Sequence, residues 1–282
     1  MRAAPQASQE LVRAQVTLSG PDWEIRTAMS VPAGPTRLVE LLPLARSFAD
    51  AVMSSAAKLV AEQGKQISCR KGCGACCRQL VPIAEVEARH IGHLVNGLQE
   101  PRRTEVRGRF AEARRRLEEA GLLEKLLHPE RWDAGERQSL GLAYFRQGIP
   151  CPFLEEEACS IYADRPIACR EYLVTSPAEN CARPTPETVE KVKPPLQVWT
   201  ALARLDRTIP SAHFVRWVPL ILAPEWFETH PQETPPRLGP ELLRELFDHL
   251  TGTGGPLAGP PGTPGDEAPP EASVRQPVLE EA

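Results

Sequence analysis

The sequence predicts a mainly α-helical protein with a few short strands, in which two sequence-distant cysteine blocks form a small cysteine-rich domain ahead of a disordered C-terminal tail. Three observations predict this fold class. Apolar residues recur at helical spacing in several segments between residues 35 and 250. All eight cysteines lie between positions 69 and 181, and proline and glycine dominate the chain after Thr251. The 282 residues are enough to bury a core without covalent cross-links.

The composition favours a globular protein without a nucleic-acid or membrane partner. The net charge of -4 argues against a general nucleic-acid binder, and the arginines of "PRRTEVRGRFAEARRRLEEA" stand among glutamates, as on a solvated helix face. Charged residues interrupt the longest apolar run, 38–60, so it predicts an amphipathic helix rather than a membrane span. The start "MRAAPQASQELVRAQ" lacks the apolar stretch of a secretory signal, and we therefore expect a cytoplasmic protein.

The N-terminal segment, residues 1–64, is expected to form a hairpin followed by a helix. The stretches "LVRAQVTLSG" and "WEIRTAMSVP" alternate in hydrophobicity on either side of a Gly-Pro-Asp turn signal. From Pro35 the pattern becomes helical, and it stops at Gly64, shortly before the first cysteine.

Residues 65–185 carry the cysteines and two further helices. Pro82 is expected to open a helix that runs to about Leu98, and another helix is expected from about Thr104. The apolar runs "CPFL" and "CSIY", on either side of "EEEA", predict a small hairpin or a pair of knuckles.

Residues 186–250 are broken by proline and contain tryptophans that we expect to pack between elements: Trp199, Trp217 and Trp226. A last helix is expected from near Pro240. Residues 251–282 hold too few large apolar residues to offset the entropy of ordering, so they are predicted to be disordered.

The cysteines form two groups with short spacings. The first group is Cys69-x3-Cys73-x2-Cys76-Cys77, and the second is Cys151-x7-Cys159-x9-Cys169-x11-Cys181. In a reducing cytosol, clustered cysteines are more often metal ligands or redox groups than structural disulfides. Gly72 and Gly74 would allow the first loop to curl, so that several sulfurs converge on one point.

Converging thiolates repel one another unless positive charge neutralises them. Basic residues that flank the cysteines could supply part of that charge; these are Arg70, Lys71, Arg78, Arg165 and Arg170. The helix after the first group carries His90 and His93, and Glu87 falls near the middle of its buried arc. Glu87 is thus a candidate ligand or a partner of an arginine, and the alternative is a glutamate at the helix boundary.

Two other interpretations of the first group stay open. Cys-x3-Cys-x2-Cys is the spacing that binds a four-iron cluster in radical S-adenosylmethionine enzymes. Against that class, Ala75 stands where an aromatic residue is usual, and no strand-helix alternation for a barrel follows. The adjacent Cys76 and Cys77 could instead form a strained vicinal disulfide with a transient redox use.

Taken together, "CRKGCGACCR", "VPIAEVEARHI" and "CPFLEEEACSIYADRPIACREY" resemble the bacterial CxxCxxCC family of zinc- or iron-chelating domains, also called YkgJ-like cysteine cluster proteins. The resemblance implies that the cysteines hold the metal: Cys69, Cys73, Cys76, Cys77, Cys151, Cys159, Cys169 and Cys181. It also implies a framework around the second block: Ile161, Tyr162, Arg165, Pro166 and Arg170. The sequence departs from the family name at its first two cysteines, which three residues separate where the name implies two.

The resemblance implies zinc or iron as the cofactor and leaves a 4Fe-4S cluster open. We interpret the chain as a cytosolic metal-chelating protein whose partner is the metal ion and whose reaction is unassigned. The alternative is an iron-sulfur-dependent redox or methyl-transferring enzyme. Some longer relatives are associated with flagellin lysine methylation, but this chain shows no methyl-donor glycine loop. A third interpretation is a scaffold whose tail and tryptophan-rich segment recruit a protein.

Overall fold

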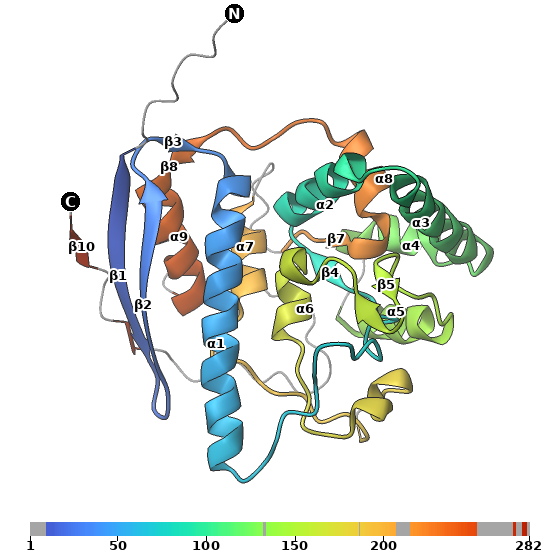
Figure 1. Cartoon of the computed structure of the whole chain (residues 1–282), viewed down its shortest axis with the longest axis horizontal. Coiled ribbons are helices and arrows are strands. Elements are labelled where there is room, and N and C mark those ends of the chain that lie inside the picture. The colour runs from blue at the N-terminus through green and yellow to red at the C-terminus, as the bar shows by residue number, and fades with distance from the viewer. Residues whose placement is uncertain are drawn as a thin grey trace, which may run out of the picture.

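A computed structural model describes residues 10–131, 134–185, 187–206, 215–252, 273–274 and 278–280 of the chain. This part is mainly helical with short strands, as the sequence predicts. Figure 1 shows a hairpin on one side of the molecule and a group of helices on the other. Between them lie helices α1 (Leu42–Glu62), α6 (Ile167–Glu171) and α7 (Val198–Leu205).

Strands β1 (Leu11–Ser19) and β2 (Glu24–Pro32) pair antiparallel, which confirms the predicted hairpin. Every second side chain of β1 enters the core, including those of Ala14, Val16 and Leu18. These side chains share a core with α1 and with α9 (Gly239–Thr251), and both helices contact β2. The other edge of β1 pairs with two short strands, β9 (Ser273–Val274) and β10 (Val278–Glu280).

Helix α1 begins at Leu42, later than the predicted start at Pro35. The preceding residues form the short 3-10 helix η1 (Leu38–Leu41) and strand β3 (Pro35–Thr36), which pairs with β8 (Arg237–Leu238). The later start has a local reason, since Pro43 occupies the first turn, where a helix has N–H groups without a partner. The helix ends before Gly64, whose φ of 74° cannot continue it, as predicted.

The helix predicted from Pro82 begins later, as α2 (Glu85–Gly97). Pro82 and Ile83 instead form β4, which pairs antiparallel with β7 (Val218–Pro219). Periodicity within one segment cannot reveal a strand partner so distant in the chain. Helix α3 (Arg102–Glu119) confirms the helix expected from about Thr104.

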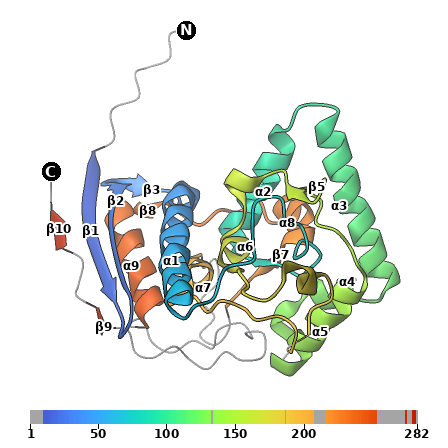
Figure 2. The ribbon, with the colours of Figure 1, turned by 60° about the horizontal axis from the view of Figure 1, so that its bottom comes forward.

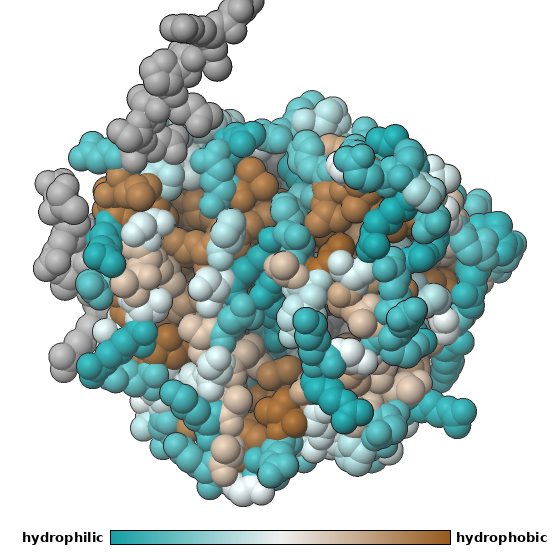
Figure 3. All heavy atoms as spheres, in the orientation of Figure 1, coloured by the Kyte–Doolittle hydropathy of each residue, from teal (hydrophilic) through white to brown (hydrophobic). Residues whose placement is uncertain are grey.

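The remaining elements complete the half of the molecule opposite the hairpin. The structure adds α4 (Leu123–Leu127), η2 (Pro129–Arg131), α5 (Ala134–Arg146), η5 (Leu220–Leu222) and α8 (Ala223–Thr229). Helix α8 packs against α2, and both share a core with α3. The last helix among the described residues, α9, begins next to the predicted Pro240. Figure 3 shows that hydrophilic side chains interrupt the hydrophobic patches on one face.

Most of the segment predicted to be disordered, 251–282, lies outside the described residues. Thr251 and Gly252 end α9, and only the two strands that pair with β1 are described beyond them. Within the described part of the chain, no helix combines the length and the apolar character needed to cross a membrane.

Three buried carboxylates join helices α2, α6 and α7 in a ring. Asp206, which follows α7, accepts a hydrogen bond from the N–H of Val86 at the start of α2. Glu87 of α2 accepts one from the N–H of Ile167 at the start of α6, at 2.8 Å. Glu171 of α6 accepts one from the N–H of Val198 at the start of α7, at 2.6 Å. Each helix thus contributes a carboxylate to the first turn of the next, where N–H groups lack helical partners.

Candidate metal centre

The first cysteine block lies in a coil of tight turns between α1 and β4. The N–H of Cys73 bonds the carbonyl of Arg70 at 3.1 Å, and the N–H of Cys77 bonds the carbonyl of Gly74 at 2.9 Å. Gly72 has a φ of 85°, a conformation that other residues rarely adopt. The coil therefore brings its four cysteines together without a helix or strand to carry them.

The second block begins with a small hairpin, which confirms the prediction around "EEEA". Strands β5 (Leu154–Glu155) and β6 (Ala158–Cys159) pair antiparallel through a turn at Glu156 and Glu157, both with positive φ. Burial raises the pKa of Cys151 and Cys159, and backbone hydrogen bonding from the N–H groups of Phe153 and Ile161 offsets part of that rise. Such N–H···S bonds favour the thiolate, which is the form that binds metal.

The two remaining cysteines lie on short helices. Cys169 lies on α6, and Cys181 lies on η4 (Ala178–Ala182) and is buried. The hydroxyl of Tyr172 bonds the Cys181 thiol, and it also accepts a hydrogen bond from Gln79 at 3.1 Å. The first block is thereby linked to the end of the second.

Backbone contacts hold the two blocks against each other. The N–H of Cys151 bonds the carbonyl of Cys77 at 2.7 Å, and the N–H of Val174 lies 3.4 Å from the Cys69 sulfur. Both contacts join residues that are far apart in sequence.

Gly74 packs directly on the β5–β6 hairpin. A Cβ atom at this position would lie 2.6 Å from a Leu154 methyl carbon and 2.8 Å from the carbonyl oxygen of Glu157. The neighbouring Arg78 forms an ion pair with Glu157 at 2.7 Å and also bonds the carbonyl of Gly74. Only glycine allows this close approach.

All eight cysteines are free thiols, and Cys76 is the electrostatic centre of the group. Charge on Cys76 raises the pKa of five other thiols, which come from both blocks: Cys69, Cys151, Cys159, Cys169 and Cys181. Cys73 raises the pKa of Cys69 and Cys181 in the same way, and Cys77 shares a hydrogen bond with Cys76. These pKa effects agree with the backbone contacts that bring the two blocks together at Cys77 and Cys69.

Burial adds to this mutual repulsion. It raises the pKa of Cys181 to about 11 and that of Cys151 to about 12, and it raises that of Cys169 well above the ordinary range. The pKa of Cys76 is raised first by its hydrogen bond with Cys77 and then by burial. A cation bound among the thiols would reverse this penalty, because it favours the thiolate over the thiol.

Among the described residues, no group of three or more His, Cys, Asp or Glu side chains lies in a geometry ready to hold a metal ion. The thiols are close enough to influence one another's ionisation but do not form a complete ligand shell. Their chemistry nevertheless fits a thiophilic cation, since sulfur ligands select zinc, copper(I) or iron-sulfur clusters. The residues present thus fit zinc or iron by donor type.

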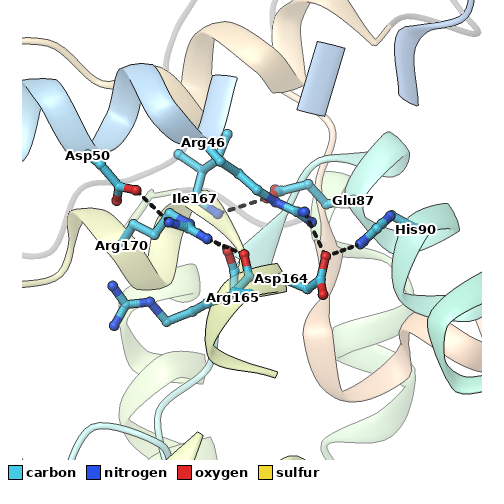
Figure 4. Close-up of polar contacts among 9 residues, drawn as sticks. Arg46, Asp50, Glu87, His90, Asp164, Arg165, Ile167 and Arg170 are labelled. Atoms are coloured by element: carbon cyan, nitrogen blue, oxygen red, sulfur yellow. Dashed lines mark hydrogen bonds and ion pairs between the residues drawn. The ribbon is translucent and has the colours of Figure 1, made fainter. Parts of the chain in front are cut away.

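The other candidate ligands have partners away from the thiols. Glu87 accepts hydrogen bonds from Ile167 and from the N–H of Ala84, and its pKa is raised by burial. His90 Nε2 lies 2.9 Å from Asp164, which also bonds Arg46 at 2.9 Å (Figure 4). The ring of His93 contacts that of Phe227 edge to face. These side chains fix helix ends and helix packing around the site.

Sequence reasoning did not find Asp206 and Glu171 as members of the carboxylate ring. Burial raises the pKa of Asp206 to about 7 and that of Glu171 to about 8. A carboxylate one residue past an apolar helix, as in "TALARLD", is the local signal that could have indicated Asp206.

Comparison with known proteins gives one match. No curated protein and no solved structure resembles this chain at a significant level. Residues 68–191, which include all eight cysteines, match the model of the CxxCxxCC family, described as "Putative zinc- or iron-chelating domain", and this confirms the predicted resemblance.

Proposed function

We propose that this chain is a cytosolic metal-chelating protein that binds zinc or iron through its eight cysteines, and that the metal closes the two cysteine blocks into one small domain. The observation that carries the proposal is the contact between the two cysteine blocks: the N–H of Cys151 bonds the carbonyl of Cys77 at 2.7 Å, and the N–H of Val174 lies 3.4 Å from the Cys69 sulfur. The family match supports metal binding independently. A reducing compartment suits the proposal, because it keeps thiols available to the metal.

The choice of metal determines what the site can do. Four thiolates around zinc leave no open coordination position, so zinc would act as a structural clamp or support an interaction surface. An iron-sulfur cluster held by the same thiolates would supply electron transfer. The residues of this chain hold the sulfurs in place, exclude part of the solvent and hydrogen-bond several of the thiols in either case.

Elemental analysis and a visible spectrum of untagged protein, purified without oxygen, test the proposal. We expect one or two zinc ions per chain and no colour, or else iron. Iron with matching acid-labile sulfide and a brown colour would favour the alternative, an iron-sulfur-dependent redox or methyl-transferring enzyme. Protein that contains neither metal and takes up neither after reduction would contradict the proposal.

One variant that removes a thiol and one control variant make the test specific. Cys76→Ser removes the central thiol, and we expect it to lose most of the bound metal. Ser160→Ala is the matched control, because it lies next to Cys159 and its hydroxyl is buried without a hydrogen-bond partner among the described residues. The control should retain the metal content of the wild type.

A further inference from the structure

Three of the five basic residues that flank the cysteines have different surroundings in the structure. Arg78 pairs with Glu157 and so fastens the first block to the hairpin. Arg170 pairs with Asp50 of α1 at 2.7 Å and bonds the carbonyl of Arg165 at 2.9 Å, so it ties α6 to α1 (Figure 4). Both guanidinium groups therefore already bond carboxylates of other segments of the chain.

Arg165 differs from both. Its Nε atom is buried and has no hydrogen-bond partner among the described residues. Its guanidinium stacks over the ring of Tyr162, with 4.6 Å between the guanidinium carbon and the ring centroid. In Figure 4 the Arg165 side chain points away from Asp164 and its partners Arg46 and His90. No dashed line reaches the Arg165 guanidinium. A buried N–H donor without a partner costs free energy, so an acceptor is expected there.

The backbone around Arg165 is fixed from several sides. Its carbonyl accepts the bond from Arg170, the preceding Asp164 bonds Arg46 and His90, and the N–H of Ile167 bonds Glu87. The side chain therefore starts from a rigid position, and the face of Tyr162 holds its charged end.

The positive charge of Arg165 reaches thiols of both blocks. It lowers the pKa of Cys69 and Cys76 in the first block and of Cys159 and Cys169 in the second. Arg170 lowers the pKa of Cys159 as well, but it is already engaged with Asp50. In the chain Arg165 lies between Cys159 and Cys169, shortly before helix α6, which carries Cys169, so a cysteine sulfur is the acceptor that we assign to this N–H.

We propose that Arg165 is a positioning residue of the metal centre, which donates its Nε–H to a metal-bound cysteine sulfur and balances the negative charge of the metal-thiolate group. This inference rests on the proposed function. A cluster of thiolates around zinc or iron stays anionic, and a guanidinium held beside it stabilises that anion by charge and by hydrogen bonding. Tyr162 serves as the platform that keeps the guanidinium in place.

Zinc affinity, measured by competition with a chromophoric chelator, tests the role of Arg165. Arg165→Gln should bind zinc about 10- to 100-fold more weakly, which is the usual effect of losing a partner of a metal ligand. Arg165→Lys keeps the charge without the planar donor and should recover part of the loss. Lys58→Gln is the control: Lys58 is exposed on α1 and lies outside both cysteine blocks, so the loss of its charge should change the affinity less than about threefold.

A spectroscopic readout separates this role from a structural one. In cobalt-loaded protein, loss of the N–H···S bond should shift the sulfur-to-cobalt charge-transfer band of Arg165→Gln to lower energy, whereas Lys58→Gln should keep the wild-type band. Tyr162→Leu offers a second variant that leaves Arg165 in the chain and should weaken zinc binding by a smaller factor.

Three results have distinct meanings. Equal affinity and equal bands in Arg165→Gln, Lys58→Gln and wild type would overturn the role of Arg165. If Arg165→Lys and Arg165→Gln lose zinc affinity equally, and neither shifts the sulfur-to-cobalt charge-transfer band, the proposed N–H···S bond would also be overturned. Wild-type protein that binds no zinc, cobalt or iron would instead contradict the proposed function itself.

Discussion

Gly74 shows how a single position decides the packing between the two cysteine blocks. Its missing side chain leaves room for Leu154 and for the carbonyl of Glu157. Gly72 is required for a different reason: its φ of 85° is a conformation that residues with a side chain rarely adopt. A Cβ atom added at Gly72 would meet no other atom within 4 Å. Two glycines only two residues apart thus have separate physical reasons.

We predict that Gly74→Ala destabilises the protein by about 1–3 kcal/mol, since the added methyl group overlaps backbone that cannot move freely. Urea unfolding measures the change. Gly108→Ala, within helix α3, is the control: its added methyl group meets nothing within 4 Å, and alanine favours a helix, so stability should be equal or higher. An unchanged unfolding midpoint for Gly74→Ala would show that the blocks do not need this close approach.

Asp206 gives a prediction about pH. Its folded-state pKa of about 7 lies above that of an unfolded aspartate, so its contribution to stability is complete at low pH and is lost as pH rises through about 7. Asp206→Asn keeps an oxygen acceptor for Val86 and cannot ionise. Only the wild type loses this stability as the pH rises. The free energy of unfolding of Asp206→Asn minus that of the wild type should therefore increase from about pH 4 to pH 7 and stay constant above pH 7. Urea unfolding across this range measures it, and a pH-independent difference would contradict the prediction.

At the scale of elements, α6 depends on its neighbours. Five residues cannot form a stable helix in isolation. Glu87 bonds its first turn, Arg170 ties it to α1, and Glu171 links it to α7. Figures 1 and 2 both show α6 beside α1, with which it is in contact. Cys169 is therefore positioned by a helix that exists only within the tertiary structure.

We predict that Glu87→Ala destabilises the protein by about 3 kcal/mol or more, because it leaves the N–H groups of Ala84 and Ile167 buried without their acceptor. Glu87→Gln should cost less, since burial already disfavours the charged form and glutamine keeps one oxygen acceptor. Thermal or urea unfolding compares the two variants. Equal stability of both variants and wild type would remove Glu87 from the support of α6.

For the whole molecule, the two cysteine blocks join segments that lie far apart in the sequence. The loop between them adds little to the cost of closure, because that cost grows only slowly with length. Metal binding can contribute on the order of 10 kcal/mol to folding when the site forms only in the folded chain. The metal should therefore stabilise the cysteine-rich part as well as complete its site.

We predict that a strong chelator lowers the melting temperature of metal-loaded protein by more than about 5 °C. Scanning calorimetry measures the shift with and without chelator. Ser160→Ala should show the full shift, and Cys76→Ser should show little, because it starts with less metal. Identical melting temperatures for the loaded and chelated wild type would mean that the metal does not close the domain.

Local signals in the sequence determined several elements of this fold. Alternating hydrophobicity indicated the β1–β2 hairpin, helical periodicity indicated α1, α2 and α3, and a proline marked the start of α9. Helix α5 was not found, because "AGERQSLGLAYFR" contains two glycines and has no strong apolar face. The cysteine spacings and their glycines indicated a convergent thiol site and the family to which residues 68–191 match.

Only the tertiary structure decided which distant groups meet. The pairing of β4 with β7 and the carboxylate ring of Asp206, Glu87 and Glu171 depend on contacts between segments far apart in the chain. The burial of the Arg165 Nε, which has no hydrogen-bond partner within the described part of the chain, likewise arises from tertiary packing. The sequence by itself determined the chemistry of the site, because residue type and short spacing define which ligands are available. The structure decided which charged groups and backbone N–H groups surround those ligands. This arrangement arises from the packing of distant segments, which no local pattern in the sequence indicates.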